Sequence, residues 1–557
     1  MSSIIREIAA DERQRSFLLP TRILRTTGRV EQAETLLDAH PLQIHIGETG
    51  TARLDNRGAA EKAGILLDFG RELHGGVRLL GASAEGCAYP MVRLRFGESA
   101  AEAMTPLGVK GAGNDHAVRD FTVPVPAMSD QEWGMTGFRF VYIELQDPEA
   151  VLTLRSVLAV YVRRELPQRG SFRCSDARLN EIFDVAAYTC RLCMQGRLWD
   201  GIKRDRLVWI GDSHPEMLAI RSLFGEQKLL EDSLDDICAY TPLPGWMNGM
   251  PAYSMWWLCI LRDWYAYTGR RDYPDRHRVY VQGLVDQLLG CIDADGRLCL
   301  EDFFLDWPSR GTTAARDGVQ GLAVLALRAG LELLALWPED GRCGRVQAAL
   351  DRLVRYPGRG DGSKPAAALL YLAGMLSPQE TAQRIGEGGA RGFSTFMSYY
   401  LLTALARTGG TAAALETLRT YYGGMLEMGA TTFWEDFSLD WMPGACPIDR
   451  LPAPGETDIH GDFGAFCYEK FRHSLCHGWS SGPVPFLLET VLGIAFEEPG
   501  GRQIRLHPSL GDLDWAEGTY PLPGGGELFV RCCRTSDGTQ TTFSAPTGIH
   551  VTVDHTA

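Results

Sequence analysis

The stretch Asp176-Ala-Arg-Leu-Asn-Glu-Ile-Phe-Asp-Val-Ala-Ala-Tyr-Thr-Cys-Arg-Leu-Cys-Met-Gln195 is the first long segment of the chain whose apolar residues have helical spacing. From there to about Leu492 the spacing stays helical, with clear segments at Leu179–Gln195, Ser254–Thr268, Val319–Trp337, Ala366–Leu376, Ser394–Thr408 and Ala412–Met428. With weaker segments between them we expect roughly a dozen helices. Antiparallel pairs of these helices would close an (α/α)6 barrel, although periodicity alone also permits an open helical array.

The chain before this helical region is rich in short apolar stretches that partly alternate with polar residues, a pattern typical of strands. Glycines at Gly70 and Gly75-Gly76 separate several of these stretches and predict turns. A β-sandwich is the simplest architecture for such strands, and we predict one for residues 1–165. The stretches concerned are Ile65–Phe69, Val77–Leu80, Val92–Phe96 and Phe138–Leu145.

Strand character returns after Glu498-Pro-Gly-Gly501, and Pro523-Gly-Gly-Gly526 is a predicted turn. The expected strands include Ile504–Leu506, Gly526–Arg531 and Thr541–Ser544. A chain of 557 residues is too long for one ordinary core. We therefore predict three domains: the N-terminal β-sandwich at 1–165, a central (α/α)6 barrel at 166–495, and a small C-terminal β-sandwich at 496–557 packed on the barrel.

The composition, with 45% apolar and 22% charged residues, is that of a water-soluble globular protein. A net charge of −15 argues against a nucleic-acid partner, and no apolar run reaches the ~18 residues of a membrane span. The first eight residues lack the pattern of a secretion signal, and the 14 cysteines are scattered rather than clustered as a disulfide framework. These features predict a cytoplasmic protein with reduced thiols, for which a homodimer stays open.

Charged residues are concentrated in the segment Asp200-Gly-Ile-Lys-Arg-Asp-Arg-Leu-Val-Trp-Ile-Gly-Asp212. On an uninterrupted helix Asp205, Trp209 and Asp212 would share one face, but the two glycines of the segment favour a loop that leads into a helix. Ser213 is the predicted N-cap of that helix. A loop at a helix entrance commonly lines a cleft. Spacing alone, however, favours the alternative of a solvated loop held by salt bridges.

Two further segments could carry chemistry. Gly429-Ala-Thr-Thr-Phe-Trp-Glu435-Asp436 follows a predicted helix end and places adjacent carboxylates after a tryptophan. The second segment, His473-Ser-Leu-Cys-His477-Gly-Trp-Ser-Ser-Gly-Pro483, has histidines at i and i+4 that could bind zinc, but it lacks the glutamate of a His-Glu-x-x-His motif. Phosphate-binding loops, dinucleotide fingerprints and nucleophile elbows are also absent from the sequence. We therefore expect no metal and no cofactor.

Taken in order, these segments resemble the bacterial α-L-rhamnosidases of glycoside hydrolase family 78. The family's acid-bearing loop is matched by Asp200 to Asp212, its Gly-Ala-Thr-Thr-x-Trp-Glu motif by Gly429 to Glu435, and its histidine motif by His477-Gly-Trp-Ser-Ser-Gly482. A Leu-Asp-Trp-Pro stretch stands at Leu305–Pro308, and Asp68–Gly76 resembles the family's β-sandwich. The order of these matches covers nearly the whole chain.

The resemblance implies an inverting glycoside hydrolase that removes terminal α-L-rhamnose from small glycosides or oligosaccharides. It implies that Asp205 is the general acid and Glu435 the general base, two carboxyl groups that must lie ~6.5–9.5 Å apart. The expected sugar-binding residues are hydroxyl ligands and ring-packing tryptophans, namely Asp200, Arg204, Trp209, Asp212, Trp307, Trp434 and His477.

One departure from the family pattern concerns the acid, which is usually glutamate and here is the shorter Asp205. Either the backbone lies closer to the substrate, or Glu216 or Asp212 is the acid. Contact of Arg204 with Asp205 would oppose protonation, so we expect Arg204 to point to sugar hydroxyls or to Asp200. The alternatives are a barrel hydrolase or phosphorylase acting on another sugar, and a non-catalytic sugar-binding protein.

Overall fold

The N-terminal strands form one sheet built around the long strand β5 (Gly64–Glu85). The structure is a computed structural model that describes residues 10–47, 50–358, 360 and 362–554, so the first eight residues, examined above for a secretion signal, lie outside it. Within these residues the sheet has nine strands in the order β3-β4-β9-β5-β8-β6-β7, with β1 paired to β9 and β2 to β5. The other strands are β1 (Arg13–Leu18), β2 (Arg22–Thr27), β3 (Arg29–Glu31), β4 (Ala52–Asp55), β6 (Met91–Gly97), β7 (Asp120–Pro124), β8 (Ser129–Leu145) and β9 (Val151–Arg164).

The glycines of β5 are not the turns that we predicted from the sequence. Gly70 and Gly75-Gly76 lie inside the strand, where its register with β8 shifts between Asp68 and Leu73 and again after Gly75. The first part of β5 pairs with β2 and the later part with β9. The glycines therefore allow β5 to bend, as a β-bulge does, so that it pairs with β2 along its first part and with β9 along its later part. Gly75 has a φ of 144°, and a Cβ there would lie 1.8 Å from the carbonyl oxygen of Val160.

The six clear helical segments predicted from the sequence are confirmed as α2, α5, α8, α10, α12 and α13. α5 illustrates why they form: proline opens it, Gly269 ends it in the left-handed conformation, and apolar residues surround its axis. It packs against α3 and α8. The helices are α2 (Ala177–Cys193), α3 (Ser213–Phe224), α4 (Lys228–Tyr240), α5 (Pro251–Thr268), α6 (Asp272–Arg276), α7 (Arg278–Gly290), α8 (Thr313–Leu334), α9 (Cys343–Leu353), α10 (Lys364–Leu372), α11 (Pro378–Gly386), α12 (Ser398–Gly409), α13 (Thr411–Glu427) and α14 (Pro483–Phe486).

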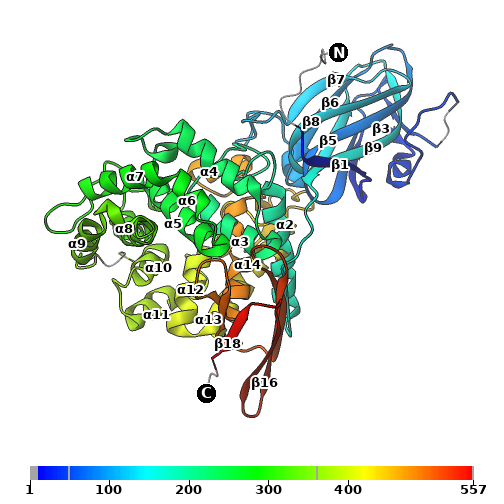
Figure 1. Cartoon of the computed structure of the whole chain (residues 1–557). Coiled ribbons are helices and arrows are strands. Elements are labelled where there is room, and N and C mark those ends of the chain that lie inside the picture. The colour runs from blue at the N-terminus through cyan, green and yellow to red at the C-terminus, as the bar shows by residue number, and fades with distance from the viewer. Residues whose placement is uncertain (1–9, 48–49, 359, 361, 555–557) are drawn as a thin grey trace, which may run out of the picture.

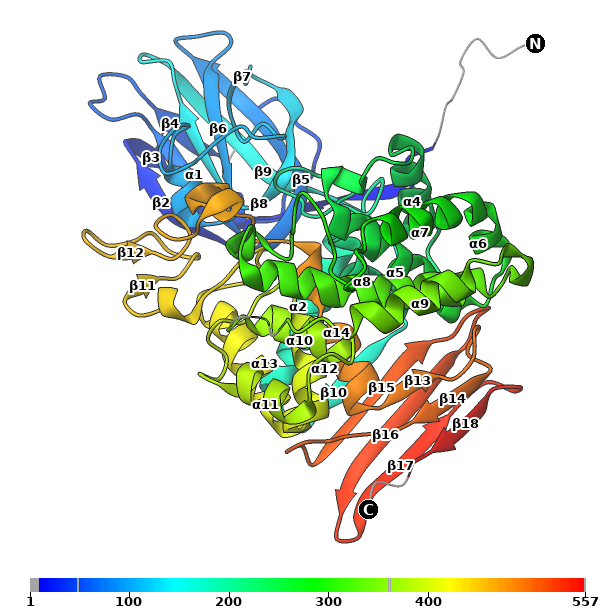
Figure 2. The same ribbon diagram turned by 90° about the vertical axis from the view of Figure 1, so that its left-hand side faces the viewer.

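The C-terminal strands form two small sheets, on the side of the helical region opposite the N-terminal sheet (Figures 1 and 2). The four-stranded sheet begins with β10 (Ser171–Cys174), which precedes the helices in sequence but pairs with β15. The predicted turn at Pro523–Gly526 is confirmed between β15 and β16. The remaining strands are β13 (Ile494–Phe496), β14 (Gln503–Leu506), β15 (Trp515–Pro521), β16 (Glu527–Thr535), β17 (Gly538–Ser544) and β18 (His550–Val553).

A long connection between α13 and α14 contacts the N-terminal part of the chain. It carries the short strands β11 (Ala445–Cys446) and β12 (Thr457–Asp458), drawn beside the N-terminal sheet in Figure 2. The backbone amide of Ala100, at the start of α1 (Ala100–Met104), donates to the carbonyl of Ile448 in this connection. The connection also contains Glu435 and His477, so the N-terminal sheet lies close to the predicted site. Among the described helices, none combines the length and apolar character that crossing a bilayer demands.

We predict that Gly75→Ala lowers the thermal unfolding midpoint by about 5 °C or more, because the added methyl group would meet backbone in a conformation that disfavours side chains. Gly290→Ala is the matched control, since nothing lies within 4 Å of its Cβ position at the end of α7. Differential scanning calorimetry measures both midpoints. Equal midpoints for the two variants would show that the bend in β5 does not require glycine.

Candidate active site

A pocket of about 310 Å³ brings together residues from distant parts of the sequence. Every site residue predicted from the sequence lines it, except Trp434. The predicted residues found there are Asp200, Arg204, Asp205, Trp209, Asp212, Trp307, Glu435 and His477. Six further residues, which we did not predict, complete the lining: His116, Met250, Tyr253, Cys467, Arg472 and Trp479.

The segment from Asp200 to Asp212 is a loop that closes on itself. The Asp200 amide donates to the carbonyl of Leu207 at 3.1 Å, and the Leu207 amide donates back to the Asp200 carboxylate at 3.0 Å. At the tip between them, Asp205 and Arg206 both have left-handed backbone, with φ of 51° and 56°. Aspartate accepts this conformation more readily than most residues do. The loop thereby presents the Asp205 carboxyl group to the pocket, with its side chain 14% exposed.

The start of the helix after this loop differs from the prediction. Ser213 is the first residue of α3 rather than its N-cap, and its hydroxyl donates to the carbonyl of Trp209. Asp212 occupies the N-cap position without a side-chain capping bond. Its carboxylate instead accepts a hydrogen bond of 2.7 Å from the hydroxyl of Tyr253 on α5. Asp212 is thus held toward the pocket.

Glu435 lies in the connection after α13 and is almost fully buried, with 3% of its surface exposed. Its amide donates to the carbonyl of Ser474 at 2.9 Å, and its Oε2 accepts from the amide of Ser474 at 3.1 Å. Its carbonyl accepts from the indole of Trp479 and the hydroxyl of Thr395. These bonds fix both the backbone and the carboxylate of Glu435, while Oε1 faces Arg204 and His477.

The guanidinium of Arg204 pairs with both candidate catalytic groups, and this overturns our expectation that it avoids Asp205. Its Nη1 lies 3.1 Å from Oδ2 of Asp205, and its Nη2 contacts Oε1 of Glu435. The side chain is 5% exposed, and its Nε donates to the carbonyl of Arg472. Burial opposes the charged form, but Glu435 and Asp205 outweigh it and raise the pKa of Arg204 above its usual value. The contact arises because a buried guanidinium needs carboxylate partners.

His477 lies between three carboxyl groups. Its Nε2 is 3.7 Å from Oε1 of Glu435 and 3.9 Å from carboxylate oxygens of both Asp200 and Asp212. Burial, together with the charge of Arg204, lowers the pKa of His477 well below its usual value, so the ring is neutral near pH 7. Burial also raises the pKa values of Asp200 and Asp212 well above the ordinary range. A neutral imidazole and a protonated carboxyl group can each both donate and accept a hydrogen bond, as a sugar hydroxyl does.

His473 and His477, which we considered as a possible pair of zinc ligands, do not lie on one face of a helix. His473 follows one short 3-10 helix and His477 precedes another. His473 is turned away from the pocket, and its Nε2 accepts a hydrogen bond of 2.9 Å from the amide of Asp436.

Trp434 does not pack on a ligand as we predicted. Its side chain is 1% exposed and makes edge-to-face contacts with Phe437 and His473 in the core. Glu216, one of the alternative acids, also fails to line the pocket, because its carboxyl group lies directly beneath Gly478. Burial raises the pKa of Glu216 well above its usual value. Of the considered acids, Asp205 and Asp212 therefore remain within reach of a bound ligand.

Two of the residues that sequence analysis missed show what limits it. Trp479 stands inside the histidine motif, two residues after His477, and could have been chosen from that position. His116 lies in the N-terminal part of the chain, between β6 and β7, far from every motif. Its Nε2 is 3.4 Å from Oδ1 of Asp205. Only the packing of the N-terminal sheet against the loop brings it there.

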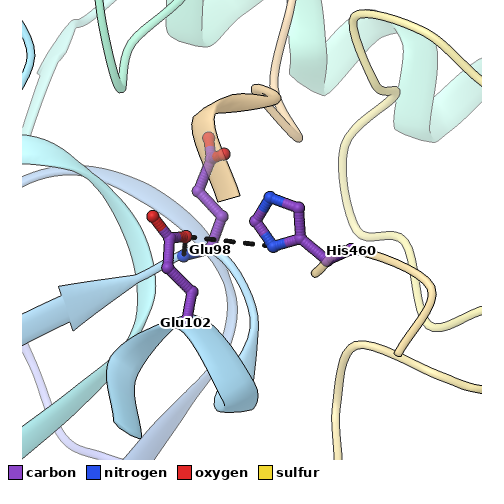
Figure 3. A group of neighbouring side chains, drawn as sticks. All are labelled: Glu98, Glu102 and His460. Atoms are coloured by element: carbon purple, nitrogen blue, oxygen red, sulfur yellow. Dashed lines mark hydrogen bonds and ion pairs between the residues drawn. The ribbon is translucent and has the colours of Figure 1, made fainter. Parts of the chain in front are cut away.

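A second group of titratable side chains is formed by Glu98, Glu102 and His460 (Figure 3). Potential ligand atoms of the three residues lie within 4.8 Å of one another. The ammonium of Lys203 already neutralises the carboxylates at 3.3 and 3.1 Å. Both ring nitrogens of His460 are also engaged, by the Ser99 hydroxyl and the His473 carbonyl. The donor set therefore fits a buried ion cluster better than a metal centre.

This cluster joins the N-terminal part of the chain to the loop from Asp200 to Asp212. Lys203 also donates to the carbonyls of Phe471 and His473, each at 2.7 Å. Burial raises the pKa of Glu98 to about 7 although Lys203 opposes the shift, and Glu98 accepts a hydrogen bond from the amide of Leu475. Because Arg204 follows Lys203 directly, the cluster fixes the base of the loop.

We predict that Lys203→Met lowers the free energy of unfolding by about 3–5 kcal/mol, because it removes the ammonium that pairs with buried Glu98 and leaves buried Glu102 with the more distant Arg119. The matched control is Lys228→Met, whose exposed ion pair with Asp232 is worth at most about 1 kcal/mol. Urea unfolding followed by circular dichroism compares the two variants. A Lys203 variant as stable as the control would contradict the compensating role of the ammonium.

The chain contains a recognisable domain of known type. Residues 167–308 match the family model described as the bacterial alpha-L-rhamnosidase 6 hairpin glycosidase domain. No curated protein sequence matches the chain.

Several solved structures share the fold. The family 78 rhamnosidase of Bacillus sp. GL1 has a TM-score of 0.72 and 24% identity, covering 94% of this chain but 55% of that one. A rhamnosidase from Klebsiella oxytoca with rhamnose bound has a TM-score of 0.63 and 20% identity, covering 86% and 96%. The Streptomyces avermitilis α-L-rhamnosidase complexed with L-rhamnose has a TM-score of 0.66 and 20% identity, covering 88% and 48%.

This chain thus spans little more than half of the Bacillus protein. The family model and the shared fold confirm the predicted resemblance to the bacterial α-L-rhamnosidases of glycoside hydrolase family 78.

Proposed function

We propose that this protein is an inverting glycosidase that removes terminal non-reducing α-L-rhamnose from small glycosides or oligosaccharides. The observation that carries the proposal is the pairing of Asp205 and Glu435, 230 residues apart in sequence, across one guanidinium in a pocket large enough for a sugar. Two structurally similar proteins bind rhamnose in their solved structures. A substrate of the same class fits a pocket lined with neutral hydrogen-bonding groups and indole rings.

For the architecture we propose that the helices of residues 166–495 close an (α/α)6 barrel, flanked by β-sandwiches at 1–165 and 496–557. The match to a six-hairpin domain supports the barrel. Packing of α10 against both α8 and α12 is the neighbour relation that such a ring requires. In this division β10 belongs in sequence to the start of the central domain, but it pairs with β15 of the C-terminal sandwich.

In the proposed mechanism Asp205 gives a proton to the oxygen of the leaving group. Its position on a tight loop tip brings the short side chain forward, which compensates for the methylene that it lacks relative to glutamate. A carboxyl group paired with a guanidinium is a poor proton donor. The contact with Arg204 must therefore give way when substrate enters, and the freed guanidinium then binds a sugar hydroxyl.

Glu435 is the proposed base that removes a proton from the attacking water. Its Oε2 is held by the amide of Ser474, which leaves Oε1 for the water. Inverting glycosidases hold their two carboxyl groups ~6.5–9.5 Å apart, which leaves room for a water, whereas retaining ones hold them ~5–5.5 Å apart. The proposal assigns the wider separation to Asp205 and Glu435, which both contact one guanidinium. When Arg204 turns toward the sugar, the space between the two carboxyl groups becomes available for that water.

We propose that the other lining residues bind the sugar itself. Asp200 and Asp212 accept or donate hydrogen bonds to hydroxyls on either side of His477. The rings of Trp209 and Trp307 supply apolar surface for the sugar face and its methyl group. This set leaves the pocket able to recognise a 6-deoxy sugar through both its polar and its apolar sides.

Phosphorolysis is the weaker alternative because the cations of the pocket are already paired. Arg472 donates to the Asp115 carboxylate at 2.8 Å and to the carbonyl of Cys467 at 2.9 Å, and Arg204 holds Asp205 and Glu435. Binding of phosphate would have to break the contacts of Arg472, while Arg204 is already assigned to a sugar hydroxyl in the proposed mechanism. Release of free sugar in phosphate-free buffer distinguishes hydrolysis from phosphorolysis.

We predict different effects of leaving-group chemistry on the two catalytic variants. Glu435→Gln should lower kcat about 10²–10⁴-fold on both p-nitrophenyl and methyl α-L-rhamnoside, because every substrate needs an activated water. Asp205→Asn should cause a similar loss on the methyl glycoside but a smaller one on the p-nitrophenyl glycoside, whose leaving group departs without a proton. Steady-state kinetics on both substrates measures these losses.

The exposed variants Asp440→Asn and Glu427→Gln serve as controls for the loss of a negative charge. Full activity of Asp205→Asn on the methyl glycoside would move the acid to Asp212. A wild-type protein that hydrolyses neither rhamnoside would leave a non-catalytic sugar-binding protein or an enzyme for another sugar.

A further inference from the structure

A separate groove lies where the N-terminal sheet meets α2. It has a volume of about 280 Å³ and is formed by β1, β9, α2 and the part of β5 that follows Gly70. Among the described residues, none that lines this groove also lines the candidate active site. The polar residues of the groove are Ser16, Arg71, Tyr161, Arg163, Tyr188 and Arg191.

The groove is positively charged, although the whole chain has a net charge of −15. Three arginines line it, and no aspartate or glutamate of the described residues does. Arg163 forms an ion pair of 2.9 Å with the exposed Glu165. Within the described part of the chain, Arg71 and Arg191 form no ion pair with a carboxylate. Arg191 instead donates from Nη1 to the carbonyl of Leu166 at 2.7 Å.

Tyrosine rings hold two of the guanidinium groups in place. The Arg71 guanidinium carbon lies 4.5 Å from the ring centroid of Tyr188 and 6.0 Å from that of Tyr161. The same Tyr161 ring, which is 3% exposed, lies 4.8 Å from the guanidinium carbon of Arg163. A ring contact leaves the N–H groups of a guanidinium free to donate. Because no described residue accepts a hydrogen bond from the Arg71 side chain, its donors are available to a ligand.

The environment of Arg191 favours an anion in the groove. Burial lowers the pKa of Arg191 from its usual value, and the charge of Arg163 lowers it further. Both effects disfavour the charged guanidinium, and a bound anion would offset both. Guanidinium groups stay protonated at neutral pH, so the groove keeps its positive charge under ordinary conditions.

We propose that this groove binds a small oxyanion, either the carboxylate of a sugar acid or a phosphate group. The forked N–H donors of arginine match the paired oxygens of both groups. A volume of about 280 Å³ lies just below the ~300–1,000 Å³ typical of pockets for drug-sized ligands, so the ligand is small. The inference does not rest on the proposed glycosidase function, because groove and pocket have different linings.

Isothermal titration calorimetry of the whole chain with inorganic phosphate and with D-glucuronate tests the site. We expect binding at millimolar concentration, and about tenfold weaker binding by Arg71→Gln, because the variant loses charged donors to the anion. Arg71 is exposed, so the variant should fold. Arg316→Gln is the matched control: this exposed arginine of α8 lies 5.0 Å from the ring centroid of Phe303, outside the groove, and its loss should leave the affinity unchanged.

The two anions distinguish the two sources of the ligand. Tighter binding of D-glucuronate would assign the groove to a sugar acid, and tighter binding of phosphate would assign it to a phosphate group. Arg163→Gln should also weaken binding, because this arginine lines the same groove. The proposal would be overturned if neither anion binds, if uncharged D-glucose binds as tightly as D-glucuronate, or if Arg71→Gln and the wild type have equal affinities.

Discussion

The guanidinium of Arg204 is buried between two carboxyl groups, and the geometry of the pocket depends on this contact. Arg204 joins the side chains of Glu435 and Asp205, and further bonds from Lys203 and Arg204 to backbone carbonyls tie the loop of Asp205 to the connection that carries Glu435. A buried cation without such partners would be strongly unfavourable. The same pairing ties the proposed acid and the proposed base to one guanidinium. In the proposed mechanism, substrate hydroxyls replace one carboxylate as the partner of Arg204.

The N-terminal sheet is part of this arrangement. Lys203, the neighbour of Arg204, is buried against Glu98 and Glu102, which lie just after β6 and on α1. Glu98 also holds the amide of Leu475, beside the Ser474 amide that fixes Glu435. The cluster thus contacts both the residue next to Arg204 and the segment that holds Glu435. His116, in the segment between β6 and β7, also lines the pocket, so the N-terminal part of the chain contributes to it directly.

Sequence patterns predicted the helices and most of the pocket for different reasons. Helices such as α5 and α13 bury one or more faces over many residues, so apolar spacing locates them to within a few residues. The pocket residues that were predicted lie in four short motifs, at Asp200–Asp212, Leu305–Pro308, Gly429–Glu435 and His477–Gly482. Gly75 was misassigned because a glycine that bends a strand has the same local sequence as one that makes a turn.

The sequence also could not predict the direction in which individual side chains point. Trp434 precedes Glu435 directly, yet its ring is buried in the core, and Arg204 contacts Asp205, which it was expected to avoid. His116 depends on packing between regions nearly a hundred residues apart in sequence, which no local pattern records. Closure of the helices into a barrel likewise depends on long-range packing and stays a proposal.

The central claim is that Asp205 and Glu435 act across a space that admits one water, which requires inversion at the anomeric carbon. Proton NMR of the sugar released in the first minutes of hydrolysis tests this directly, before mutarotation mixes the anomers. We expect the first-formed product to be β-L-rhamnose, with the α-anomer growing in later. Initial accumulation of α-L-rhamnose would contradict this account, because it would require a covalent intermediate on one of the two carboxylates.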